Sequence, residues 1–278
     1  FLAEVMRPFN KYDIEYLNSC YSTINSYYYF AGEYAEAIAF GKQYLDFARQ
    51  TGSKFDIMLA YSKIGTSYER TGKYQEAIRN IDLSIRAFPF GQFNASLFAL
   101  QIIKAKCFSG LKKHDKAIHL AEQTIEQILS HKLKKKAKIL DFEIAQIVDL
   151  HSHNYINIFA SAGLLFIERY KQDSSKTDLL KAEKILRTST AMFREFYLKG
   201  AYNPTLYNLH SKNAEGLLYI ATEKYKEDPG AVTGILNLIE ENASKHLYRQ
   251  YQRKAGGSEI HRTDRLDTDR DNLEKLME

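Results

Sequence analysis

The sequence offers few side chains that could do catalytic chemistry. Cys20 and Cys107 could act as thiolate nucleophiles beside the scattered histidines. His151 and His153 lie near Asp149 and could begin a metal site. Positions two apart on a helix face different ways, however, and no further ligand follows at a useful interval. Packing inside helices explains both cysteines. We therefore predict no catalytic residue, no metal site and no cofactor, and we expect the chain not to be an enzyme by itself.

One stretch concentrates positive charge. Residues 131–138 supply five lysines, whereas the formal net charge of the whole chain is +5 at pH 7 with histidine neutral. The remainder is thus near neutral, and the run has no interleaved aromatics, so a nucleic-acid partner is disfavoured. A solvated helix start and a contact with RNA or an acidic partner remain alternatives for these lysines. Gly256 and Gly257 lack the second half of a phosphate-binding loop.

Composition favours a helical, water-soluble protein. The chain has 278 residues, of which 45% are hydrophobic and 26% charged, with only four prolines. No stretch approaches the roughly 18 apolar residues that a membrane span needs. No signal peptide is visible, although the chain begins at Phe1. Two distant cysteines without a bridging pattern indicate a reducing compartment, so we expect a cytoplasmic protein without membrane contact.

Residues 58–91 predict two amphipathic helices joined by a tight turn. Large residues on the first helix would face small ones on the second, so the two axes could approach closely. The residues that carry this pattern are Tyr61, Ile64, Gly65, Tyr68, Gly72, Tyr74, Ala77, Ile81, Ser84 and Pro89.

The pattern recurs every forty residues. Matching positions are Tyr28, Tyr68 and Phe108; Gly32 and Gly72; Tyr34, Tyr74 and His114; and Ala37, Ala77 and Ala117. Repeats are predicted at 13–54, 55–94 and 95–131. After them the period breaks, and residues 132–151 predict a further amphipathic helix. Residues 158–199, with a polar loop at 171–176, and residues 204–254 read as two degenerate hairpins.

These residues at these offsets resemble the tetratricopeptide repeat, a helix–turn–helix unit of about 34 residues. The resemblance implies an all-α fold, a tetratricopeptide α-solenoid in which hairpins stack into a right-handed superhelix. We expect residues 1–12 to be the tail of a truncated preceding repeat, 13–131 to form three repeats, and 132–254 to hold the extra helix and two eroded hairpins. Residues 255–278 would be a linker and the start of a charged helix that leads to a missing C-terminal region.

The resemblance also implies a concave groove lined by the first helices. Its groove-facing positions would be Ser19, Ser22, Ser26, Tyr29, Phe30, Leu59, Ser62, Thr66, Glu69, Arg70, Ala99, Ile102, Lys106 and Ser109. Family members that clamp a carboxylate use Lys, Arg and Asn where this chain has Ser22, Ser26, Ser62 and Thr66. Such a clamp is disfavoured, and small hydroxyl residues suit a peptide backbone or a partner helix.

We therefore expect a protein–protein interaction module that binds a peptide or a partner helix, as the sensor part of a larger bacterial protein. Residues 238–247 and the charged coil after them are similar to the end of the repeat region in bacterial proteins that join such repeats to a caspase-like CHAT protease. Regulation of a CHAT protease is thus one alternative. A peptide-sensing transcriptional regulator and a plain assembly scaffold are others. The oligomeric state stays open.

Overall fold

The computed structural model describes residues 11–88, 94–198, 204–226, 233–235 and 237, and these residues form helices, turns and irregular segments without a β-strand. The expected tail before residue 11, Pro89, the last helix expected over 230–254 (beyond a few residues) and the expected linker and charged helix at 255–278 lie outside the described residues. The chain divides into two units, 1–223 and 224–278. In the second unit Ile235 is buried within a short helical stretch.

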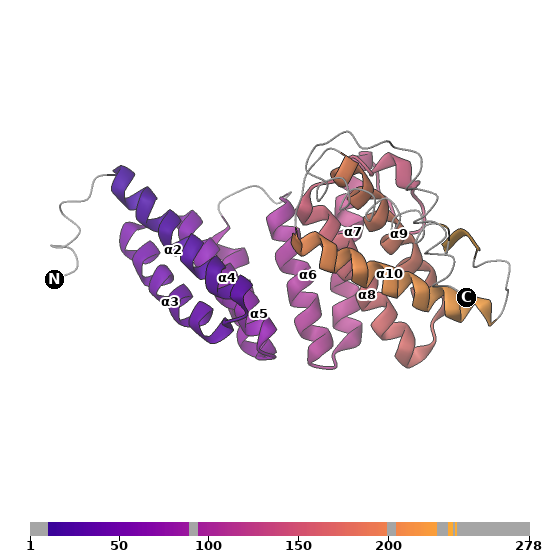
Figure 1. Ribbon diagram of the computed structural model, residues 1–278, viewed down its shortest axis with the longest axis horizontal. Helices are drawn as coiled ribbons and strands as arrows, with labels where there is room; N and C mark the ends of the chain where they lie inside the picture. Colours follow the sequence, from indigo (N-terminus) through magenta and orange to yellow (C-terminus); the bar gives the residue numbers. More distant parts are fainter. Residues whose placement is uncertain (1–10, 89–93, 199–203, 227–232, 236, 238–278) are drawn as a thin grey trace, which may run out of the picture. The chain divides into compact units, whose positions relative to one another are not determined.

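Within each hairpin the two helices follow one another with a short connection, whereas α7 and α8 are separated by residues 134–152 (Figure 1). In chain order they are α2 (Lys11–Ala31), α3 (Tyr34–Thr51), α4 (Lys54–Arg70), α5 (Tyr74–Ala87), α6 (Ala95–Gly110), α7 (His114–Leu133), the 3-10 helix η1 (Ile144–Gln146), α8 (His153–Asp173), α9 (Lys176–Leu198) and α10 (Pro204–Tyr225).

Each α-helix from α2 to α8 packs against the next α-helix in the chain. The first helices of successive hairpins also touch, because α4 contacts α2, α6 contacts α4, and α8 contacts α6. A hairpin that packs both within itself and against its neighbour buries two faces of every helix. The described part of the chain is therefore an array of helical hairpins, and this arrangement fits an α-solenoid.

Local sequence explains where the helices start and stop. Ser53 and Asn94 cap α4 and α6, since the Ser53 side chain accepts from the Asp56 amide at 3.3 Å and the Asn94 side chain accepts from the Ser96 amide at 2.8 Å. Gly72 takes the left-handed conformation (φ 72°) in the turn between α4 and α5, and Gly32 does so (φ 84°) between α2 and α3. These turns reverse the chain within a few residues.

The prediction of a further helix over residues 132–151 is wrong. Helix α7 ends at Leu133, because Lys134 adopts a left-handed conformation (φ 53°) and its amide bonds the His131 carbonyl at 3.3 Å. The segment after it is irregular except for η1. Its buried side chains are Ala137, Ile139, Phe142 and Ile147, which lie too irregularly along the chain for one helix face. Their apolar pattern reflects a packed non-helical segment rather than a helix.

The fourth hairpin is longer than expected. Helix α8 continues to Asp173, so the polar loop expected over 171–176 shrinks to Ser174 and Ser175 before α9 begins. No helix in the described ranges carries an apolar stretch long enough to cross a membrane.

Candidate functional site

A cleft of about 460 Å³ opens where the ends of α4, α6 and α8 meet the starts of α5 and α7. It therefore borders three successive hairpins. Its lining residues are Glu69, Tyr74, Lys106, Ser109, Gly110, Lys112, His114, Leu165, Glu168, Lys171 and Gln172.

A close approach between two helices shapes one wall of the cleft. A Cβ atom built on Gly110 would lie only 2.3 Å from Cζ of the Tyr74 ring. Because no side chain can occupy that space, the aromatic ring rests directly on the α6 backbone. Gly110 thus lets Tyr74 of one hairpin reach the first helix of the next.

An ion-pair chain lies along the α4 side. Lys106 Nζ on α6 is 2.6 Å from Glu69 Oε1 on α4, and Arg70 Nε is 3.8 Å from Glu69 Oε2. Arg70 Nε in turn donates to Tyr29 Oη of α2 at 3.0 Å, and its guanidinium lies 5.9 Å from the centroid of that ring. Lys106 and Arg70 therefore both pair with the negative charge of Glu69, and the chain of contacts links α2, α4 and α6.

A second network lies on the α8 side. Ser109 Oγ on α6 donates to Glu168 Oε2 on α8 at 2.6 Å, and it lies 3.3 Å from Nδ1 of His114. The other ring nitrogen of His114, Nε2, lies 2.8 Å from the amide nitrogen of Gln172. Serine bonds the carboxylate directly here, so histidine is not oriented by an acid as in a hydrolytic triad. The arrangement orders one wall of the cleft.

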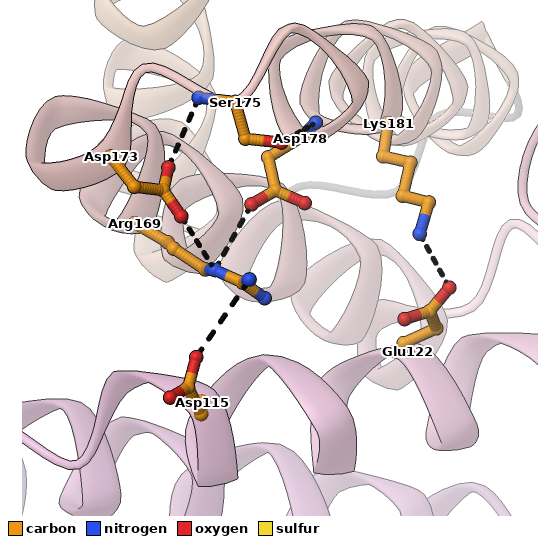
Figure 2. Close-up of polar contacts among 7 residues, drawn as sticks. All are labelled: Asp115, Glu122, Arg169, Asp173, Ser175, Asp178 and Lys181. Carbon is orange, nitrogen blue, oxygen red and sulfur yellow. Dashed lines mark hydrogen bonds and ion pairs between the residues drawn. The ribbon is translucent and has the colours of Figure 1, made fainter.

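The last turn of α8 is held in place by one arginine, as Figure 2 shows. Arg169 Nε lies 3.1 Å from Asp173 and 3.2 Å from Asp178, and its Nη2 lies 3.7 Å from Asp115 at the start of α7. Asp178 is only 4% exposed, and burial raises the pKa of its carboxyl, which Arg169 partly offsets. Lys181 Nζ adds a 2.6 Å pair with Glu122 of α7 (Figure 2). These contacts fix the helix end that carries Lys171 and Gln172.

Of the predicted groove residues, Glu69, Lys106 and Ser109 line the cleft together. Ser26 and Tyr29 instead connect α2 to α4, because they accept hydrogen bonds from Lys63 (2.6 Å) and from Arg70. The residues that are half-buried and not part of the cleft lining are Ser22, Leu59, Ser62, Thr66 and Ala99.

Two predicted groove residues differ sharply in exposure. Ile102 is only 2% exposed, so its expected role as a groove contact is wrong: it packs inside the helical array. Phe30 is 71% exposed, at the last turn of α2. Ser19 and Arg70 are also exposed.

The repeat-defining residues take the places that tight packing needs. Ala37, Ala77 and Ala117 are buried, and Gly65 lies so close to α5 that an added Cβ would meet Ile81 at 2.9 Å. Tyr28, Tyr34, Tyr61, Tyr68, Tyr74 and Phe108 are half-buried between helices.

Sequence reasoning missed the contribution of α8 to the cleft. Glu168, Lys171 and Gln172 lie where the forty-residue period no longer applies, and the repeat pattern predicts for His114 only a structural position. The sequence signal for the longer α8 is the helical spacing of apolar residues over 158–170, because the polar residues that follow contain no residue that would end a helix before Asp173.

The remaining candidates from the sequence are the cysteine nucleophile, the metal site and the lysine run. Cys107 is fully buried, and burial, together with Glu69, raises the pKa of its thiol to about 12, so it is a poor nucleophile. The described residues hold no group of three His, Cys, Asp or Glu side chains placed to bind a metal ion. In the lysine run, Lys132 pairs with Asp149 at 2.5 Å and Lys138 with Glu126 at 2.7 Å; Lys134, Lys135 and Lys136 are exposed.

No protein-family model matches the chain, and no curated protein sequence matches it either.

Proposed function

We propose that this chain is a protein–protein interaction module of the tetratricopeptide type, without chemistry of its own, that binds a segment of a partner protein in the cleft between α4, α6 and α8. The observation that carries the proposal is the cleft of about 460 Å³ bordered by three successive first helices. Its size is that of an ordinary ligand pocket, and its open form suits a chain that enters and leaves rather than an enclosed small molecule.

The polar groups of the cleft support binding because they are already ordered. The Glu69–Lys106 pair and the Ser109–Glu168 bond each join two successive first helices at 2.6 Å. Side chains held in this way lose little further conformational entropy when a partner arrives, which lowers the cost of association. Beside them, the Tyr74 ring and Leu165 supply apolar surface. A peptide would thus find apolar contact next to fixed donors and acceptors.

The test uses the full chain as bait for a phage-displayed random dodecapeptide library. Recovered peptides are synthesised with a fluorescent label, and their dissociation constants are measured by anisotropy. We expect Gln172→Trp, which places an indole in the cleft, to weaken binding at least about tenfold, since a filled pocket removes roughly 1.4 kcal/mol or more.

The matched control is Gln123→Trp, at an exposed position of α7 that does not line the cleft. We expect it to leave peptide binding unchanged. Equal affinity of both variants and the wild-type chain would contradict the proposal. Loss of binding with Thr66→Trp but not with Gln172→Trp would instead place the partner on the middle of the first helices.

The compartment we propose is reducing, as the two free thiols suggest.

A further inference from the structure

Helix α2 presents a stripe of exposed aromatic side chains that the proposed peptide cleft does not use. Tyr16, Tyr27 and Phe30 are 71%, 69% and 71% exposed, and Tyr12 is 79% exposed. Together with the exposed Ser19 and Thr23 they follow one another at steps of three or four residues, which places them on one face of the helix. We call residues 12, 16, 19, 23, 27 and 30 the aromatic stripe.

Part of the corresponding side of the later first helices is buried, at the positions that match Ile24 and Tyr27. Ile64 of α4 lies forty residues after Ile24, and it is 1% exposed because it packs with Tyr44 and Leu45 of α3. Cys107 of α6 lies eighty residues after Tyr27, and it is fully buried against Ala77 and Ile81 of α5.

On α2 the same positions remain open, with Ile24 41% and Tyr27 69% exposed. At these two positions the later first helices are covered by the second helix of the preceding hairpin, whereas Arg70, forty residues after Phe30, is exposed. A helix is therefore the kind of partner that this part of α2 fits.

The aromatic stripe is nearly symmetric about its own centre. Reversing its direction about residue 21 exchanges Tyr12 with Phe30 and Ser19 with Thr23, and it brings Tyr16 to within one residue of Tyr27. Large rings thus occupy both ends, and small hydroxyl residues occupy the middle. Such a surface is complementary to a second copy of itself in antiparallel orientation, as a two-fold interface requires.

The exposed area is sufficient for a dimer. An aromatic side chain buries about 150–250 Å². Four rings in each of two copies, each about 70% exposed, therefore offer on the order of 1,000 Å², which is near the lower limit for a specific interface. Aromatic rings exposed to this extent on one helix face are uncommon on a surface that stays in water.

We propose that the chain forms a two-fold dimer through antiparallel packing of α2 against α2 of a second copy, with Tyr16 next to Tyr27 of the other copy. Cys20 is half-buried beside the aromatic stripe and within one residue of its centre. The dimer therefore places the two Cys20 thiols near the two-fold axis. Cys107 is fully buried in each copy.

The first test is sedimentation equilibrium of the full chain over a concentration series. We expect a monomer–dimer equilibrium, and we expect the double variant Tyr16→Glu, Tyr27→Glu to raise its dissociation constant at least about a hundredfold, because two aromatic anchors are lost per copy. Leu180→Glu is the matched control: this exposed apolar residue lies on α9. A monomer at all concentrations, or a dimer equally tight in the double variant, would overturn the proposal.

The second test is cross-linking with a short bismaleimide. We expect a covalent dimer that Cys20→Ser abolishes and Cys107→Ser leaves intact. Dimers without a Cys20 cross-link would overturn antiparallel α2 packing. A monomer whose Cys20 reacts only slowly with maleimide would assign the cover of the aromatic stripe to another segment of the same chain, and so would also overturn the proposal. Peptide binding in the cleft is measured separately, so the two proposals fail independently.

Discussion

The hairpins α4/α5 and α8/α9 share a packing motif although only the first carries the repeat pattern in full. In each, a glycine of the first helix lies against the second helix: Gly65 against Ile81, and Gly163 against Leu186. In each, a serine three residues after that contact donates to a carbonyl seven residues before the glycine. The bonds are Ser84 to Met58 at 2.8 Å and Ser189 to Ile156 at 3.0 Å.

The difference between the two hairpins is length. The paired residues are 16 apart in sequence for Gly65 and Ile81, and 23 apart for Gly163 and Leu186. These seven extra residues add about one turn to each helix on the side of the connecting turn. The added turn of α8 carries Lys171 and Gln172 to the cleft. The two hairpins thus share the same contact between their helices, but α8 extends further beyond that contact than α4 does. The extension of α8 contributes part of the cleft lining.

The largest expected loss of stability comes from placing a side chain at the glycines where the two helices of a hairpin are in contact. Valine at Gly65 or Gly163 should each lower the free energy of unfolding by about 3 kcal/mol, because its first carbon already meets Ile81 at 2.9 Å or Leu186 at 2.7 Å. Gly65 should suffer more, since the backbone nitrogen of Ile81 lies 3.2 Å away and cannot rotate aside. Urea unfolding measures both. Ala39→Val, at an exposed position of α3, is the control. Unchanged stability in either glycine variant would show that the shared crossing is not tight.

The hydrogen bonds of Ser84 and Ser189 should contribute different amounts to the free energy of unfolding. Ser84→Ala should cost about 1 kcal/mol, the value of one buried hydrogen bond. Ser189→Ala should cost about 2–3 kcal/mol, because Ser189 Oγ also accepts from the buried Asn213 amide of α10 at 2.9 Å, and its loss leaves that donor without this partner. Chemical denaturation of both variants, with the exposed Ser96→Ala as control, measures the difference. Equal losses would mean that α10 does not stabilise the fourth hairpin through this bond.

A pH dependence should arise in the longer hairpin. The pKa of Asp178 is raised by burial, so the folded chain holds this proton more tightly than the unfolded chain does. Stability contributed by Asp178 should therefore fall as pH rises from its ordinary pKa to the raised one, and then stay constant. Asp178→Asn should remove this part of the profile in thermal melts across pH. Glu76→Gln, at the exposed counterpart in the first turn of α5, is the control. An identical profile in Asp178→Asn would contradict the assignment.

The smallest expected effect concerns the turns. Gly72 and Lys112 lie forty residues apart and share left-handed φ values of 72° and 61°. Lys112→Gly should raise stability by about 0.5–1 kcal/mol, because a side chain is strained in this conformation and glycine is not. Gly72→Ala should lower it by about 1 kcal/mol for the same reason. Thermal unfolding compares the two, and a loss of stability in Lys112→Gly would show that its side chain contributes contacts that outweigh the strain.

The forty-residue pattern determined much by itself. It indicated three helical hairpins: the first two turns contain glycine, and an alanine is buried in the second helix of all three, because glycine at a turn and alanine at a crossing follow from local geometry. It could not indicate how α8 would extend, since one added turn per helix shifts every later position by seven residues and hides the repeat. Nor could it show that residues 134–152 form no α-helix: apolar spacing alone does not separate a helix from a non-helical segment that contacts α9 through η1.

Only the tertiary structure decided which polar residues meet. Glu69, Lys106, Ser109 and Glu168 come from three helices, and no spacing in the sequence specifies that they share a cleft. Their contacts depend on how far each first helix extends beyond its crossing, which is a property of neighbouring hairpins together. The same reason explains Ile102 and Phe30: the position of each in the repeat predicts the same groove, but Ile102 is buried, while Phe30 is exposed on the aromatic stripe.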